Sequence, residues 1–169
     1  LAIAVSNAGG LGSLPCAMLA PDAMLKELEA IRASTSKPYN VNFFCHAQPQ
    51  PDAQRDAAWR SALAPYFAEL ELDADAVPVG PGRLPFSAEA AELLEAFRPP
   101  VVSFHFGLPP ADLFKRVKAL GCVTMSSATT VAEVEWLNRA AREVLISEGR
   151  LGAGSITVHL TAPDRVQEA

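Results

Sequence analysis

The sequence has little cysteine, no excess of positive charge and no long apolar run. Its three cysteines are an odd number without CxxC spacing, which predicts reduced thiols in a cytoplasmic protein rather than a disulfide scaffold. Acidic residues outnumber basic ones by 19 to 14, so binding of a nucleic acid by phosphate neutralisation is not expected. No run approaches the roughly 20 apolar residues that span a bilayer. The sequence therefore predicts neither a membrane segment nor a nucleic-acid partner.

Familiar catalytic loops are also missing. The glycine-rich segment 6–13 (SNAGGLGS) lacks the third glycine of the dinucleotide-binding fingerprint, and it follows a predicted helix rather than a strand. The chain has no Walker-type GK[ST] and no GxSxG nucleophile elbow. Spacing alone therefore favours a tight helix-to-strand turn at 6–13 over a phosphate-binding loop.

Apolar strands and amphipathic helices alternate along the chain. Half of the 169 residues are hydrophobic, which is enough for one domain with a sizeable core. The last three strands recur about every 21 residues with one helix between each pair, and this rhythm predicts an α/β fold with a parallel sheet. The expected strands are 11–14, 39–45, 101–106, 122–127 and 144–147, and the expected helices are 1–7, 22–35, 52–71, 88–98, 111–120 and 131–142.

Two segments have a weaker pattern. Residues 73–86 carry three prolines and should be irregular. Within 150–169, a short alternating run at 155–160 (SITVHL) predicts either one more strand or no ordered element. We therefore expect a domain at 1–149 and a divergent C-terminal tail at 150–169.

Two polar residues lie where parallel α/β sheets bind ligands. His105 comes at the end of the predicted strand VVSFHF, and ligands bind at the carboxyl ends of such strands. His105 is either a catalytic or anchoring residue or a histidine satisfied within the core. The amide of Asn42, within YNVNFF, must be hydrogen-bonded by neighbouring backbone or by a ligand such as a flavin ring. Cys45 and His46 could join His105 around a metal, but they lack short-range ligand spacing, so no metal is expected.

Four strings of the sequence together resemble one family. They are AVSNAGGLGSL (4–14), KPYNVNFFCH (37–46), VVSFHFGLPP (101–110) and SSATTVAEVEWLNRA (126–140). In content, order and spacing they are similar to the nitronate monooxygenases, formerly called 2-nitropropane dioxygenases. The resemblance covers about residues 1–149.

This resemblance implies a flavoprotein with a partial (β/α)8 TIM barrel, in which strands two to six are present. It implies FMN at the carboxyl ends of the strands, with Asn42 as a flavin contact and His105 near the substrate. The family activity would be oxidation of an alkyl nitronate with O2 to a carbonyl compound and nitrite. An open sheet edge would favour a covering second chain, so a homo-oligomer is one expectation.

The chain departs from the family after the family's sixth strand, which the resemblance places at 144–147. Counting from Ala128 places Glu148 at the family's flavin-contacting glutamine and Gly154 at one of its glycines. The resemblance thus assigns Asn42, Glu148 and Gly154 to cofactor binding, although the charge of Glu148 should weaken it. The family's proposed catalytic histidine is replaced by Ser155.

Three functions are compatible with the sequence. The first is a nitronate monooxygenase-like oxidoreductase, with this chain alone expected to be inactive because a complete barrel needs about 250 residues. The second is another FMN barrel enzyme, which reduces a quinone with NAD(P)H or an enoyl thioester. The third is a non-catalytic remnant.

Overall fold

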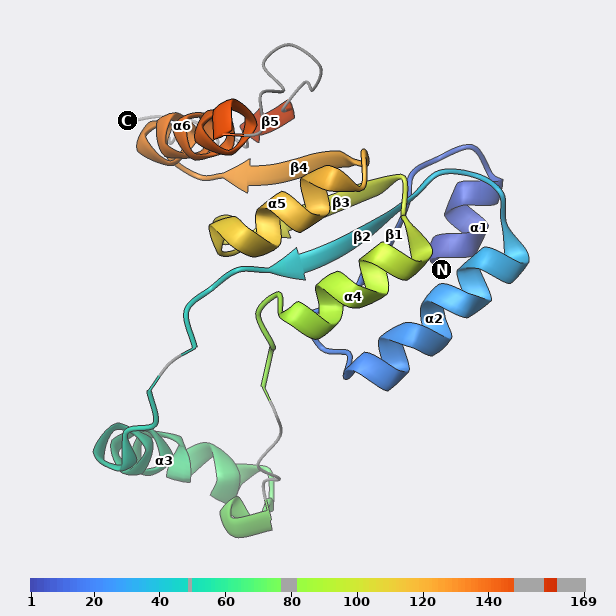
Figure 1. The fold of residues 1–169 in the computed structure, drawn as a ribbon. Coiled ribbons are helices and arrows are strands. Elements are labelled where there is room, and N and C mark those ends of the chain that lie inside the picture. The colour runs from blue at the N-terminus through green and yellow to red at the C-terminus, as the bar shows by residue number, and fades with distance from the viewer. Residues whose placement is uncertain (49, 77–81, 148–156, 161–169) are drawn as a thin grey trace, which may run out of the picture. The chain divides into compact units, whose positions relative to one another are not determined.

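The structure is a computed structural model that describes residues 1–48, 50–76, 82–147 and 157–160. One parallel sheet holds five strands in the order of the sequence, each beside the one before it (Figure 1). They are β1 (Gly12–Pro15), β2 (Tyr39–Phe44), β3 (Val101–His105), β4 (Val123–Ala128) and β5 (Thr157–Leu160). This sheet confirms the expected α/β fold.

The chain divides into two compact units, residues 1–46 with 83–169 and residues 47–82. The smaller unit holds α3 (Ala53–Glu69) and the short 3-10 helix η1 (Ala74–Ala76). Asp52 accepts hydrogen bonds from two backbone N–H groups and so caps α3, none of whose residues is buried. The boundary expected between residues 149 and 150 lies outside the described residues and stays a prediction.

The described part of the larger unit contains the sheet and five helices. They are α1 (Ala2–Asn7), α2 (Pro21–Ser34), α4 (Ala88–Phe97), α5 (Ala111–Ala119) and α6 (Val131–Ser147). The residues at the starts of α2 and α4 explain why these two helices begin there. Pro21 opens α2 at a position where a missing N–H costs nothing. Ser87 Oγ accepts a hydrogen bond from the Ala90 N–H at 3.3 Å and caps α4, as expected.

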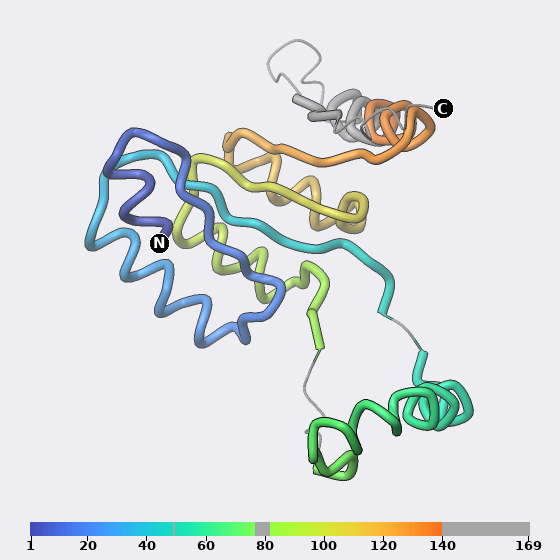
Figure 2. Tube along the Cα trace, turned by 180° about the vertical axis from the view of Figure 1, so that it is seen from behind, coloured from blue at the N-terminus to red at the C-terminus, as the bar shows by residue number. Residues whose placement is uncertain are grey.

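The strand order is that of a barrel wall. Helices α2, α4 and α5 lie along one face of the sheet. Figure 2 shows the same arrangement from the opposite side. A doubly wound sheet would reverse its strand order and carry helices on both faces. The larger unit is therefore a partial (β/α)8 barrel.

Alternate strand residues face these helices and form the core. Burial alternates along β1 and β4, as in a sheet with one covered face. The covered face contributes apolar side chains from the strands, Leu14, Val41, Phe43, Val102 and Phe104, and from the helices, Leu28, Ile31, Leu94, Phe114 and Val117. The Phe104 ring is fully buried, with its centroid 5.4 Å from Phe86 and 6.2 Å from Phe114. Each large side chain buried here contributes about 1.5–3 kcal/mol.

Segment 6–13 is the expected tight turn between α1 and β1. A Cβ on Gly12 would lie 2.0 Å from the carbonyl oxygen of Ala2, so only glycine fits there. Ser6 Oγ accepts a hydrogen bond from the Gly12 N–H at 3.2 Å and donates one to the Pro38 carbonyl at 2.9 Å. This serine thereby ties α1 to the start of the sheet.

The predicted strand at 144–147 is wrong, because these residues form the last turn of α6. The β-branched Val144 and Ile146 favoured a strand. However, Val144 continues the helical spacing of the buried Leu137, and no glycine or proline interrupts the chain before Gly149. The fifth strand is β5 instead, inside the run where the sequence left a strand open.

Candidate functional site

The face of the sheet opposite the helices carries polar side chains, and we name it the polar face. The strand register and the period of two place Ser13, Asn40, Asn42, Ser103 and His105 on it. Asn42 pairs with Ser103 in register, and His105 lies two residues further along β3. Asn42 and His105 therefore share one face of the sheet, as their predicted roles require.

The polar face opens toward the carboxyl ends of the central strands. Val101 and Ser103 are buried, whereas Asn42, Phe44 and His105 are half-buried. This is the edge at which barrel enzymes bind their ligands.

A serine joins the two asparagines of β2. Asn40 Nδ2 donates hydrogen bonds to Ser13 Oγ at 2.9 Å and to Ser103 Oγ at 2.8 Å. Asn42 Nδ2 donates to the same Ser103 Oγ at 2.9 Å. Asn40 Oδ1 is buried and has no hydrogen-bond partner among the described residues. A buried acceptor of this kind costs free energy.

His105 is held by the next strand. Its Nδ1 lies 2.6 Å from the hydroxyl oxygen of Ser127 on β4. This hydrogen bond fixes the imidazole ring and leaves Nε2 as the nitrogen that can face a ligand. Sequence reasoning missed Ser127, because the pairing of β3 with β4 cannot be counted from the sequence alone.

Aromatic rings border the site at the ends of β2 and β3. The Phe44 ring lies edge-to-face with Phe106 at 4.9 Å and with His105 at 6.3 Å between centroids. Phe106 is 66% exposed and has a left-handed backbone with φ 63°, which is strained for a bulky residue. Such strain is found at functional sites more often than elsewhere.

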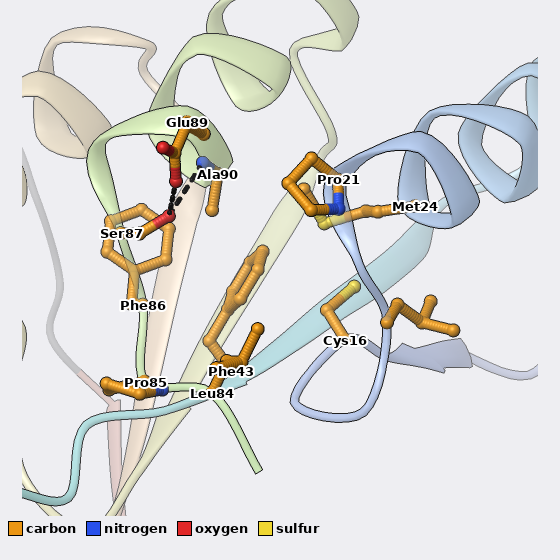
Figure 3. A pocket seen from close by; sticks show the side chains of 11 residues that line it. Cys16, Pro21, Met24, Phe43, Leu84, Pro85, Phe86, Ser87, Glu89 and Ala90 are labelled. Carbon is orange, nitrogen blue, oxygen red and sulfur yellow. Dashed lines mark hydrogen bonds between the residues drawn. The ribbon is translucent and has the colours of Figure 1, made fainter. Parts of the chain in front are cut away.

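A separate cavity of about 240 Å³ lies on the covered face (Figure 3). It is mainly apolar, between the loop after β1, the start of α2 and the segment before α4, and is lined in part by Cys16, Met24, Phe43 and Phe86.

Burial raises the pKa of the Cys16 and Cys45 thiols to about 12. Both are therefore neutral at physiological pH and unsuited to nucleophilic chemistry.

Two further site residues that the sequence suggests cannot be placed in the structure. Glu148 and Gly154 lie outside the described residues, so their assignment to cofactor binding stays a prediction. Within the described ranges, no three His, Cys, Asp or Glu side chains are grouped to hold a metal ion. In the same ranges, no helix is long and apolar enough to cross a membrane.

Comparison with known sequences gives one consistent result. The sequence model of the nitronate monooxygenase family matches residues 1–167. The nitronate monooxygenases of Paraburkholderia phytofirmans and Pseudomonas aeruginosa are each 38% identical to this chain, over 151 and 153 residues. Each match covers 88% of this chain but only 41% and 43% of the relative, so the chain spans less than half the length of these relatives.

Comparison with solved structures agrees. A nitroalkane oxidase from Streptomyces ansochromogenes superposes with a TM-score of 0.65 at 33% identity, over 82% of this chain and 39% of that one. FabK from Thermotoga maritima superposes with a TM-score of 0.53 at 21% identity, over 82% of this chain and 32% of that one. The second likeness concerns the fold alone.

Proposed function

Because the chain belongs to the nitronate monooxygenase family, we propose that its polar face forms part of a flavin-dependent site that oxidises alkyl nitronates. The observation that carries the proposal is the shared face of Asn42 and His105 at the carboxyl edge of the sheet. The products would be a carbonyl compound and nitrite. The electron transfer from nitronate to O2 would be supplied by bound FMN.

The residues of the polar face fit a flavin ring. A flavin edge alternates hydrogen-bond donors and acceptors, and the amide of Asn42 can match either. Asn40 is buried behind it and is bound to Ser13 and Ser103 rather than presented to a ligand. Asn42 would therefore hold the heterocycle against β2.

His105 would bind the anionic substrate. In the tautomer in which His105 Nδ1 accepts a hydrogen bond from the Ser127 hydroxyl, Nε2 carries the ring N–H and can donate to a nitronate oxygen. The bordering rings of Phe44 and Phe106 would exclude water and contact the alkyl group. This division of roles places the charge of the substrate at His105 and its apolar part at the aromatic border.

The first test is flavin retention followed by reduction without oxygen. The chain is incubated with FMN, passed through gel filtration, and mixed anaerobically with propionate 3-nitronate or with NADH. We expect a flavin band in the protein peak that is bleached by the nitronate and not by NADH, a result that would replace the expectation from the sequence that this chain alone is inactive. Bleaching by NADH alone would favour a quinone or enoyl reductase, and a colourless folded peak would favour a remnant without a flavin site.

Variants then locate the site. His105→Ala should slow bleaching by the nitronate by 10²-fold or more, on the order expected for loss of a positioned polar group. The matched control is Ser126→Ala, because Ser126 is buried on the covered face of β4, where its hydroxyl makes a long hydrogen bond of 3.5 Å to the Gly107 carbonyl. Equal slowing in both variants would contradict the assignment of His105.

A further inference from the structure

Ser103 has an unusual place on the polar face, because one hydroxyl oxygen serves two amides. Asn40 Nδ2 and Asn42 Nδ2 both donate to Ser103 Oγ, at 2.8 and 2.9 Å. A hydroxyl has two acceptor positions, and here both are occupied. Ser103 is 6% exposed, so solvent offers these amides no equal replacement.

This arrangement determines what Asn42 shows to a ligand. One N–H of its amide is bound to Ser103, so Oδ1 and the second N–H are the groups left for binding. Asn40 donates both of its N–H groups, to Ser13 and to the same Ser103, so one oxygen of β3 links the two amides of β2. The hydrogen bond that the structure gives to the Asn42 amide is the one to this oxygen.

Resting on the proposed function, we propose that Ser103 is a positioning residue that fixes the Asn42 amide so that its Oδ1 and free N–H meet an imide-type edge of the flavin ring. Ser103 itself needs no contact with the ring. With both acceptor positions filled, its hydroxyl can act further only as a donor. Ser103 thus contributes to cofactor binding indirectly, by orienting the amide of Asn42.

The side-chain amide of Asn42 reports this role without any flavin. In ¹⁵N-labelled chain, its NH₂ resonances are identified by their loss in Asn42→Asp. Ser103→Ala should move and broaden them, and Ser103→Thr, which keeps the hydroxyl, should restore them. Ser126→Ala is the matched control, because Ser126 is 8% exposed on the neighbouring strand but lies on the covered face. If Ser103→Ala unfolds the chain, Ser103→Cys keeps the volume and weakens the acceptor.

The dissociation constant of FMN provides the second readout. Ser103→Ala should weaken binding about tenfold, the effect of losing one oriented hydrogen bond, whereas Ser126→Ala should not. In an Asn42→Ala background, Ser103→Ala should add no further loss, because the serine acts through that amide.

The two proposals fail in different ways. Unchanged Asn42 resonances in both Ser103→Ala and Ser103→Cys would overturn the role of Ser103, and so would additive losses of FMN affinity in the double variant. If the wild-type chain binds no FMN while Ser103→Ala still moves the Asn42 resonances, the positioning by Ser103 stands and the flavin assignment fails.

Discussion

The two faces of the sheet use the same strands for different purposes. On the covered face, Val41, Val102 and Phe104 are fully buried against helices. On the polar face, their sequence neighbours Asn42, Ser103 and His105 form hydrogen bonds with side chains of adjacent strands. A period of two thus lets each strand contribute to both the core and the candidate site.

Residues that stabilise the fold and residues that could bind a ligand therefore alternate along each strand. Covered-face residues gain free energy by leaving water, and that gain does not depend on a ligand. On the polar face, Asn40 Oδ1 is buried and has no hydrogen-bond partner among the described residues, which costs free energy that the covered face does not lose. Substitutions on the two faces should therefore affect different measurements.

The largest effect is expected on the covered face. Phe104→Ala should lower the free energy of unfolding by about 3–5 kcal/mol, because the ring is fully buried among other aromatic rings. Urea denaturation followed by circular dichroism measures the change. Ser13→Ala, an exposed polar-face substitution, is the control. Equal losses in both variants would remove the distinction between the faces.

A smaller effect is expected at the strained Phe106. Phe106→Gly and Phe106→Ala both remove the ring, but only glycine adopts φ 63° without strain. The glycine variant should therefore be more stable than the alanine variant by about 1–2 kcal/mol. Thermal unfolding of the pair measures this difference. Equal midpoints would mean that the left-handed backbone stores no strain.

Two adjacent serines of β4, Ser126 and Ser127, lie on opposite faces of the sheet and allow the two faces to be compared within one strand. Ser127→Ala removes the hydrogen bond to His105 Nδ1, which contributes about 0.5–1.5 kcal/mol, and should slow flavin bleaching by the nitronate up to about tenfold. Ser126→Ala, on the covered face, should leave the bleaching rate unchanged. Anaerobic stopped-flow absorbance compares the two. A slower rate in Ser126→Ala alone would contradict the assigned faces.

The smallest effect concerns the start of α6 and depends on pH. Hydrogen bonds from the Thr129 backbone N–H and hydroxyl, and from the Thr130 N–H, hold the pKa of Glu133 below its ordinary value of 4.5. A lowered folded-state pKa stabilises the fold above 4.5, and this contribution is lost as the pH falls through the folded-state value. Glu133→Gln should therefore be less stable than wild type at pH 7, by a margin that shrinks in acid. A margin independent of pH would show that the carboxylate charge has no part in the cap.

The sequence predicts most of the fold because its signals are local. Proline at Pro21 and the cap at Ser87 define helix starts, and alternation in YNVNFF indicates which residues share a face. The prediction of a strand at 144–147 was wrong because the β-branched residues Val144 and Ile146 occur both in strands and in a helix that continues an apolar spacing.

The candidate site was predictable only in part. Asn42 and His105 stand out as polar residues near strand ends. Ser103 and Ser127 matter through pairing between strands, and sequence spacing within one strand does not give that register. The strain at Phe106 depends on a backbone angle that no residue type other than glycine signals in advance.

NMR titration of FMN into the labelled chain measures directly whether FMN binds on the polar face. The side-chain amides of Asn40 and Asn42 should shift on binding, while the methyl groups of Met24 and Val102 on the covered face stay unchanged. Shifts centred on Met24 and its neighbours in the covered-face cavity, with the asparagine amides unmoved, would contradict binding on the polar face.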